Sequence, residues 1–467
     1  MLQTILQRIN HWWRTGAVNQ IYLPASVRSE LTEVLSALQK RRILAIIGPR
    51  RTGKSTLIMQ SIDHLLKSGV DCKRILLFGG DEQRLFVDKA DIFTIIEEYL
   101  RETVGESVEA LSERIYIFID EIHFCADWQI ILKNYYDKLY NIKFIVSGSS
   151  SAHLFDNARE SLLGRIEYLH VLPLSFSQFL QFNNSLRGQS TAILFNETKH
   201  SVITNPVEFY EEIRKDYYAV VIDNSYQRLL KEYFIGGGYP EYFCHDNLLV
   251  WQKQLREDTI MQGLYRDVVS VFGVKNPEIL ERLLGFVADN QGQAFSFASL
   301  AQTIGVEAAT ASSYVDYLDK AFLLTALENY SGNFGKTLRK NKKLFVLDNG
   351  IRNSLLSQSE IDATTEGALA ESCVVQDLCK FARVNIGSVY YWRDNKIEVD
   401  AILKFANNII PIEVKYRNSI DKKSSAGIKT FTAKFECNQG IIVSKNILAL
   451  ENDILTVPLW VFALAVH

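Results

Sequence analysis

The segment Gly48-Pro49-Arg50-Arg51-Thr52-Gly53-Lys54-Ser55-Thr56 decides how the amino-terminal part of this chain folds. It follows the apolar run 43–47, which is typical of a buried parallel strand, and it precedes residues 57–62, which have helical spacing. Gly48 and Gly53 let backbone amides face an anion without an intervening side chain, and the helix that begins after them presents its positive end. The sequence therefore predicts a strand, a glycine loop and a helix that together hold the phosphates of a nucleotide.

The side chains of this segment indicate separate roles in nucleotide binding. Lys54 is expected to reach the outer phosphates as a point charge, and the Ser55 hydroxyl is expected to help coordinate a magnesium ion. Thr56 belongs to the candidate site by position, although helix packing explains it better. The alternative for the whole segment is a glycine turn that matches the pattern by chance.

Length and composition limit the class of protein. A chain of 467 residues predicts two to four domains, each with its own core. The formal net charge of -3 gives no overall argument for nucleic-acid binding, so any basic surface has to be local. The six cysteines are scattered without a C-x-x-C pair, which suggests neither a disulfide framework nor a structural zinc site. No apolar stretch approaches the roughly 20 residues of a membrane span, so we expect a cytoplasmic protein.

Two acidic residues follow the apolar run 115–119, at the carboxyl end of a predicted strand. Open α/β sheets place their ligands at this end of the strands. Asp120 is expected to hold magnesium, directly or through water, and Glu121 is expected to orient and deprotonate the attacking water. A strand that ends in a solvated acidic turn is the alternative, and the phosphate loop upstream weighs against it.

Hydroxyl side chains lie at the end of a further predicted strand, which begins at Lys143. Ser147 is our candidate for sensing the γ-phosphate or positioning the water, and Ser149 is the second choice. These serines could equally cap a helix that we expect from 152 to 163.

The carboxy-terminal part carries a second acidic pattern. Asp400 lies on one predicted strand, Glu413 and Lys415 lie on the next, and Glu371 lies on a preceding helix. Adjacent strands would bring Asp400 and Glu413 together to bind one or two divalent metals, and strand alternation would put Lys415 on the same face as Glu413. Glu371 could complete the metal shell. This is the pattern of the PD-(D/E)xK nucleases, although such folds also persist as binding platforms.

A helix-turn-helix spacing precedes that pattern, with a short helix at 299–304, a turn at Gly305, a longer helix at 308–321 and a wing-like strand at 322–327. The longer helix has hardly any arginine that could read bases, so we weigh a lid or spacer role equally with non-specific DNA contact. A dense basic patch follows, where phosphate contact and a solvated loop are equally reasonable. The patch contains Lys336, Arg339, Lys340, Lys342 and Lys343.

Together these segments resemble a family of prokaryotic AAA+-type ATPases in which the ATPase module is joined to a carboxy-terminal domain of unknown function. The resemblance rests on the motifs at 48–55, 119–122, 147–150, 163–165, 172–176 and 236–241. It implies ATP hydrolysis but no particular biological task. In AAA+ proteins an arginine placed as Arg165 is here lies at a subunit edge, so the resemblance makes it a candidate finger for a neighbour's nucleotide. A surface arginine beside the helix C-cap glycine Gly164 is the alternative.

We therefore expect an α/β protein with a P-loop AAA+-type parallel-sheet domain at 1–175 and a helical lid at 176–275 that contains an insertion at about 182–226. A winged-helix-like unit at 276–330 and a restriction-endonuclease-like α/β domain at 331–467 would follow. The predicted function is Mg²⁺-dependent ATP hydrolysis coupled to DNA binding or remodelling in a homo-oligomer, without membrane association. An ATP-gated, metal-dependent nuclease and a nucleotide-switched module with protein partners are the alternatives.

Overall fold

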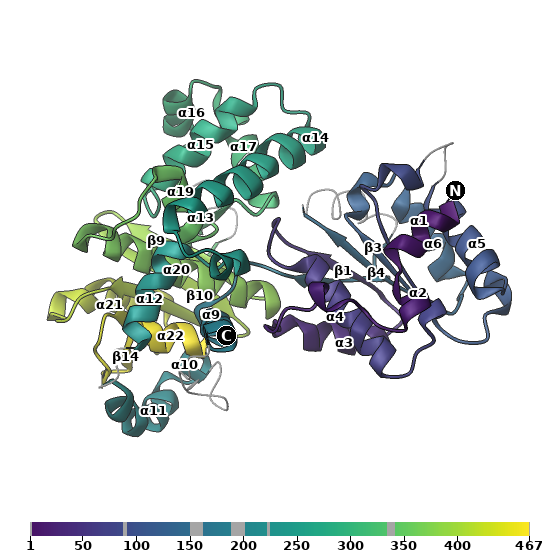
Figure 1. Cartoon of the computed structure of the whole chain (residues 1–467). Coiled ribbons are helices and arrows are strands. Elements are labelled where there is room, and N and C mark those ends of the chain that lie inside the picture. Colours follow the sequence, from purple (N-terminus) through teal and green to yellow (C-terminus); the bar gives the residue numbers. More distant parts are fainter. Residues whose placement is uncertain are drawn as a thin grey trace. The chain divides into compact units, whose positions relative to one another are not determined.

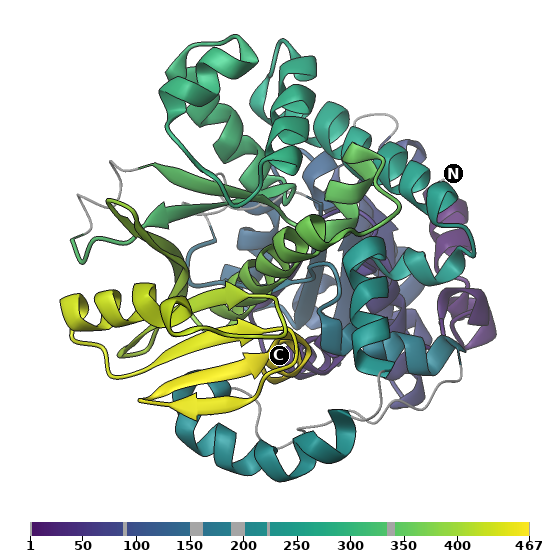
Figure 2. The same ribbon diagram turned by 90° about the vertical axis from the view of Figure 1, so that its left-hand side faces the viewer.

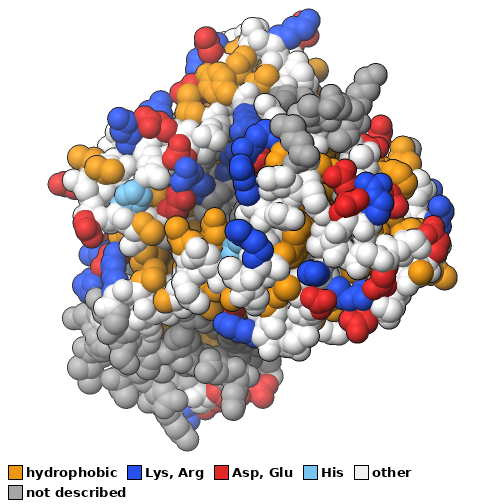
Figure 3. Space-filling model, turned by 45° about the vertical axis from the view of Figure 1, so that its right-hand side comes forward, with side chains coloured by type: hydrophobic (Ala, Val, Ile, Leu, Met, Phe, Trp, Pro, Cys, Tyr) orange, Lys and Arg blue, Asp and Glu red, His pale blue; other side chains and the backbone are white. Residues whose placement is uncertain are grey.

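The computed structural model describes residues 2–86, 91–149, 162–187, 201–221, 225–333 and 341–466. The chain divides into two compact units, an amino-terminal unit, Met1–Leu172, and a carboxy-terminal unit, Pro173–His467. Figure 1 traces their elements along the chain. On the face drawn in Figure 3, acidic and basic side chains lie intermingled, in agreement with the small net charge.

The described part of the amino-terminal unit contains a parallel sheet of five strands in the order β2-β3-β4-β1-β5. Its strands are β1 (Ile43–Ile47), β2 (Ile75–Gly79), β3 (Ile115–Asp120), β4 (Ile142–Gly148) and β5 (Ile166–His170). Every residue of β1 is buried, as expected for a parallel strand that is covered on both faces. The expected α/β domain with a parallel sheet is confirmed. Because β4 lies between β1 and β3, the carboxyl ends of these strands meet at one edge of the sheet.

Helices flank this sheet, and the first of them protects its edge strand. They are α1 (Leu2–Ile9), α2 (Trp12–Thr15), α3 (Glu30–Gln39), α4 (Lys54–Lys67), α5 (Ile92–Tyr99) and α6 (Trp128–Asp137). The buried Asn10 between α1 and α2 donates its Nδ2 to Leu77 O at 2.9 Å and accepts from Leu77 N at 2.6 Å. These bonds satisfy backbone groups of the edge strand β2, which would otherwise remain open to pairing with another chain.

Lys143 is a buried charged residue near the amino end of β4. Its side chain is 1% exposed, and its Nζ donates a hydrogen bond to Arg42 O. Burial lowers the pKa of Lys143 to about 8, although Glu167 opposes this effect. A charged lysine at this depth is destabilising at neutral pH because its hydration is lost.

Lys143→Met is expected to raise the melting temperature at pH 7, since replacing buried charge with an apolar side chain of similar volume stabilises by about 1–4 kcal/mol. The pKa of the parent lysine is lower in the folded chain than its ordinary value of 10.5. The unfolded chain therefore binds more protons between about pH 8 and 10, and this group makes the parent more stable as pH rises through that window. Calorimetry across these pH values should show that the variant lacks this gain. Lys138→Met, at an exposed position, is the control. A variant that melts below the parent at pH 7 would contradict the expectation.

Among the described residues of the carboxy-terminal unit, nine strands form one mixed sheet in the order β13-β14-β12-β11-β10-β9-β7-β8-β6 (Figure 2). The strands are β6 (Ala294–Phe295), β7 (Leu324–Asn329), β8 (Lys342–Val346), β9 (Ser388–Asp394), β10 (Ile397–Phe405), β11 (Asn408–Lys415), β12 (Gly440–Ser444), β13 (Ala449–Glu451) and β14 (Ile454–Pro458). Strands β9, β10 and β11 are antiparallel, whereas β11, β12 and β14 are parallel. One sheet thus joins the strands that follow the helix-turn-helix spacing to the strands that carry the second acidic pattern.

Helices pack against this sheet in two hydrophobic clusters. The first cluster contains α9 (Phe176–Arg187), α10 (Ser201–Thr204), α11 (Pro206–Val221), α12 (Ser225–Gly236), α20 (Ala363–Val384) and α22 (Leu459–Ala465), and α21 (Ala426–Phe435) packs on β10 and β11. The second cluster contains α13 (Leu248–Leu255), α14 (Val269–Phe272), α15 (Pro277–Asp289), α16 (Phe297–Ile304), α17 (Ala308–Lys320) and α19 (Asn349–Leu356). Figure 1 shows α15, α16 and α17 together. Gly305, between α16 and α17, has φ +78°. The predicted domain boundaries at 275 and 330 stay predictions.

The glycine run 236–238 is a packing element. A side chain on Gly237, which has φ +76°, would lie 2.1 Å from Asp348 Oδ1. Gly238 N donates to Asp348 Oδ2 at 2.8 Å, and Gly238 O accepts from Leu174 N at 2.6 Å. The run therefore brings its backbone against the start of α19 at a distance that only glycine permits.

Within the described ranges, no helix combines the length and the apolar character needed to cross a bilayer.

Candidate functional site

The loop after β1 has the backbone that a phosphate-binding loop requires. Gly53 precedes α4 with φ +94°, and Arg51 has φ +62°. A side chain on Gly48 would lie 2.0 Å from Val171 O, because the chain after β5 runs beside the loop and Val171 N bonds to Ile47 O at 2.7 Å. Glycine at these positions lets the loop approach its neighbours and begin α4, and the amino end of a helix favours an anion.

Lys54 lies inside this loop, on the first turn of α4. The residue is 5% exposed, and its Nζ donates to Gly48 O at 2.9 Å and to Pro49 O at 2.8 Å. The buried Thr52 hydroxyl donates to Pro49 O at 3.0 Å. The loop therefore holds a positive charge at its centre, which is the chemistry that nucleotide phosphates need.

Three elements bring the predicted magnesium and water-positioning residues together. Ser55 Oγ of α4 donates to Asp120 Oδ2 of β3 at 2.6 Å, and Ser147 Oγ of β4 donates to Asp120 Oδ1. Glu121 N donates to Ser147 Oγ at 3.2 Å. Hydroxyl and carboxylate oxygens are the ligands that Mg²⁺ prefers, so Ser55 and Asp120 fit the ion that accompanies a nucleotide.

Glu121 follows β3 in a conformation that is rare for a side-chain-bearing residue, with φ +48°. Its Oε2 lies 3.3 Å from Nδ1 of the nearly buried His123. A side chain on Gly80 would lie 2.5 Å from Glu121 O. Glycine at this position therefore allows the chain just after β2 to pack closely against the turn that contains Glu121. Non-glycine residues with such backbone angles cluster at functional sites. Sequence reasoning missed His123, whose spacing of two residues from Glu121 was the available signal.

Arg28 is a second residue that sequence reasoning missed. Its side chain is 4% exposed and forms an ion pair with Glu30 at 2.7 Å. Its Nη1 donates to Thr52 O at 2.7 Å, and its Nη2 donates to Leu172 O at 2.8 Å. Arg28 therefore ties the phosphate loop to the segment after β5. No local motif marks this arginine, because the two backbone carbonyls to which it donates lie 24 and 144 residues away.

Arg28→Met is expected to lower the stability of the amino-terminal unit by about 3–5 kcal/mol, since breaking a buried charged pair leaves its partners without compensation. Calorimetric melting of the variant measures the loss. Arg84→Met is a matched control, because Arg84 also pairs with a glutamate two residues away but is 64% exposed. The melting temperature of the control should not change. A loss of the same size in both variants would show that Arg28 has no special role.

Arg165, the candidate finger, lies at the turn before β5. Its Nε and Nη2 donate to the carboxylate of Asp137 at 2.6 and 3.1 Å, and its side chain is 30% exposed. Its proposed reach into a neighbouring subunit stays a prediction. Ser149 is 2% exposed, and the helix expected at 152–163 lies almost wholly outside the described residues.

The residues of the second acidic pattern lie close together in the carboxy-terminal unit. Val414 N donates to Asp400 Oδ2 at 2.8 Å, and Lys415 Nζ donates to Glu413 Oε1. Burial raises the pKa of Glu371 and that of Glu413 to about 7, and the charge of Asp400 adds to both shifts. The predicted grouping of α20, β10 and β11 is therefore present.

Lys343 of β8 joins this grouping, which the sequence did not suggest. Its Nζ lies 3.2 Å from Glu371 Oε1, 2.6 Å from Glu398 Oε1 and 3.8 Å from Asp400 Oδ1. We call Glu371, Glu398, Asp400 and Glu413 the acidic cluster. Within the described ranges, no group of three or more His, Cys, Asp or Glu side chains is arranged to hold a metal ion.

The predicted phosphate contact is wrong for Lys343, whose side chain is 2% exposed. Lys342 points to the other face of β8 and pairs with Glu328 at 3.2 Å. Lys336, Arg339 and Lys340 of the basic patch lie outside the described residues.

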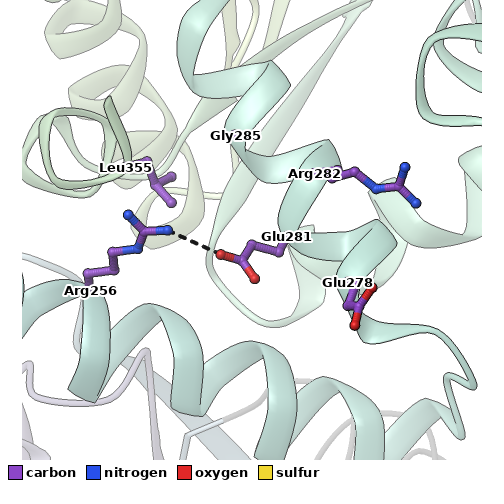
Figure 4. Close-up of a pocket in the computed structure, with 6 residues that line it drawn as sticks. All are labelled: Arg256, Glu278, Glu281, Arg282, Gly285 and Leu355. Carbon is purple, nitrogen blue, oxygen red and sulfur yellow. Dashed lines mark hydrogen bonds and ion pairs between the residues drawn. The ribbon is translucent and has the colours of Figure 1, made fainter. Parts of the chain in front are cut away.

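A separate pocket of about 360 Å³ lies beside α15. Figure 4 shows charged side chains around it, with Arg256 and Glu281 paired at 3.2 Å. Its lining includes two arginines and two glutamates, so the formal charges of these four side chains sum to zero.

Known proteins resemble this chain in its amino-terminal region and along most of its length. Residues 40–180 match a family model described as an AAA domain, and residues 227–362 and 366–462 match two families described as domains of unknown function (DUF8612 and DUF4143). An uncharacterized protein of Methanocaldococcus jannaschii is 28% identical over 428 residues, which cover 90% of this chain and 84% of that protein. An uncharacterized protein of Haemophilus influenzae is 27% identical over 386 residues, which cover 80% of this chain and 82% of that protein.

Among solved structures, the ORC2 protein of Aeropyrum pernix is 12% identical with a TM-score of 0.36, covering 77% of this chain and 97% of that one. The RuvB Holliday junction branch migration motor of Thermotoga maritima is 17% identical with a TM-score of 0.27, covering 66% of this chain and 93% of that one. Such TM-scores are too low to carry a functional argument. The match over residues 40–180 supports an ATPase of the AAA+ type.

Proposed function

We propose that this protein hydrolyses ATP with the help of Mg²⁺ at the site formed by the loop 48–56 and the ends of β3 and β4. The observation that carries the proposal is the hydrogen-bonded series Ser55–Asp120–Ser147, which lies beside the loop that encloses Lys54. Ser55, Asp120 and Ser147 come from α4, β3 and β4, and each is of the type that phosphoryl transfer to water requires.

The residues have separate roles in this reaction. The N–H groups of the loop around Gly48 and Gly53 and the ammonium of Lys54 bind the phosphates, and Ser55 and Asp120 would hold Mg²⁺. When bound, Mg²⁺ neutralises charge that develops on the phosphate oxygens. Glu121 accepts the proton of the attacking water, and Ser147 orients that water. His123, 3.3 Å from Glu121, keeps the carboxylate in place.

Phosphate release by the purified full chain tests the proposal. We expect turnover with ATP and Mg²⁺ that stops when EDTA removes the metal. A chain that neither releases phosphate nor retains ATP in equilibrium dialysis would refute the proposed activity.

We further propose that this turnover is coupled to DNA. The support is the helix pair α16–α17, which is joined by the turn at Gly305. A binding panel of single-stranded, duplex and branched DNA, read with and without ATP, is the test. Stimulated turnover would support coupling, whereas indifference to every DNA would favour a module that switches protein partners. DNA cleavage that disappears in Asp400→Ala while ATP turnover persists would identify a nuclease.

Arg165→Ala is expected to lower ATP turnover at least about tenfold without weakening ATP binding, because an arginine supplied to a neighbouring site stabilises transition-state charge. The proposed homo-oligomer would supply it. Arg101→Ala is the control, since Arg101 is also exposed and paired with an acidic neighbour. Turnover is measured together with mass by light scattering. A monomer with full activity would rule out this role for Arg165.

A further inference from the structure

The ammonium of Lys343 lies at the centre of the acidic cluster. It contacts Glu371 from α20 and both Glu398 and Asp400 from β10. Its Nζ is also 5.6 Å from the centre of the Tyr391 ring on β9, which adds a favourable cation–π contact. A lysine that is 2% exposed and surrounded by carboxylates is held in place by its charge.

The position of Lys343 on β8 directs its side chain toward the acidic cluster, and a neighbouring turn covers one carboxylate of that cluster. Neighbouring side chains of a strand point to opposite faces, so Lys342 pairs with Glu328 on the other side of β8. Gly292, in the turn between α15 and β6, has φ +78° and donates its N–H to Leu344 O at 3.1 Å. A side chain there would lie 3.1 Å from Glu371 Oε1. This turn thus lies over Glu371.

We infer that Lys343 is the resident cation of the acidic cluster, in the place where a PD-(D/E)xK site would hold a divalent metal, and that the cluster binds no such metal. Mg²⁺ lies about 2.0–2.1 Å from its oxygen ligands, so an ion on Glu371 and Asp400 would be within about 5 Å of the ammonium. Repulsion between these charges in a partly buried site opposes binding. Moving Lys343 away would break its ion pairs with Glu371, Glu398 and Asp400.

The cluster consequently has a structural role. Lys343 ties β8, which follows the helix-turn-helix spacing, to α20 and β10, while Lys415 neutralises Glu413. The residues therefore do not fit a divalent ion, and no cleavage step through a metal follows from them. The inference is independent of ATP hydrolysis, which uses residues of the other unit.

Mn²⁺ titration of the nucleotide-free full chain, followed by electron paramagnetic resonance, tests the inference. In the parent chain, Asp400→Asn should leave the Mn²⁺ isotherm unchanged. Lys343→Met should add one Mn²⁺ site with at least tenfold tighter binding than any site of the parent, and Asp400→Asn should remove it. Lys342→Met, a lysine on the opposite face of the same strand, should add no site.

The result that would overturn the inference is a Mn²⁺ site of the parent chain that Asp400→Asn removes. A folded Lys343→Met variant that gains no site would also overturn it, because the lysine would then not be what excludes the metal. Should Lys343→Met fail to fold, the comparison of the parent with Asp400→Asn still decides the matter. Incubation of supercoiled plasmid with the parent and Mn²⁺ adds a second readout, in which we expect the DNA to remain intact.

Discussion

Lys54→Ala is expected to weaken ATP binding by at least about 100-fold, or about 2.8 kcal/mol. The lysine is the buried positive charge of the loop, between the carbonyls of Gly48 and Pro49. Without it, the phosphates would face those carbonyl oxygens with no cation to offset them. Titration calorimetry with a non-hydrolysable ATP analogue measures the loss, and a melting curve shows whether the fold persists.

Lys67→Ala is the matched control for this variant. Lys67 is at the other end of α4, is 71% exposed and pairs with Asp63. Its loss should leave ATP affinity unchanged. If Lys54→Ala bound ATP as tightly as the parent does, the nucleotide site would have to lie elsewhere.

Glu121→Gln is expected to slow ATP turnover by about 10²–10⁴-fold, which is the usual contribution of a general base. Glutamine keeps the size of the side chain but cannot accept a proton from water. The variant should bind ATP within about threefold of the parent, since the residues assigned to the phosphates are untouched. Single-turnover kinetics with radiolabelled ATP separates binding from hydrolysis.

Glu113→Gln serves as its control, because Glu113 is 71% exposed just before the amino end of the same strand. Turnover of that variant should equal that of the parent. Unchanged turnover in Glu121→Gln would remove Glu121 from the role of base and leave His123 or another group to be tested.

The two variants are expected to affect different steps: Lys54→Ala weakens ATP binding, whereas Glu121→Gln slows ATP hydrolysis without weakening binding. Comparing them in an assay of biological function would distinguish a nucleotide switch from a motor. A protein that only senses ATP needs Lys54 but not Glu121, whereas one that does work through hydrolysis needs both. If Lys343 is the resident cation of the acidic cluster, that cluster supplies no metal-dependent cleavage chemistry.

Local patterns were sufficient for the strands β1, β3 and β4 and for the loop between β1 and α4. The short apolar run 43–47, followed by a glycine loop, favours a strand buried on both faces, and glycine before Lys54 permits the turn into a helix. Asp120 and Ser147 were predictable because both end parallel strands, and such ends meet at one edge of a sheet.

The sequence by itself thus determined the nucleotide loop, the acidic strand end and the grouping of Asp400 with Glu413, since each depends on short-range periodicity. Only the tertiary structure decided that Arg28 holds the loop and that Lys343 enters the acidic cluster. Lys343 belonged to a basic run for which phosphate contact and a solvated loop were equally reasonable from the sequence, whereas in the fold it lies on β8 with its side chain buried against Glu371. The physical reason is that a charge is neutralised by whatever the fold places within a few ångströms, and sequence spacing does not encode that distance.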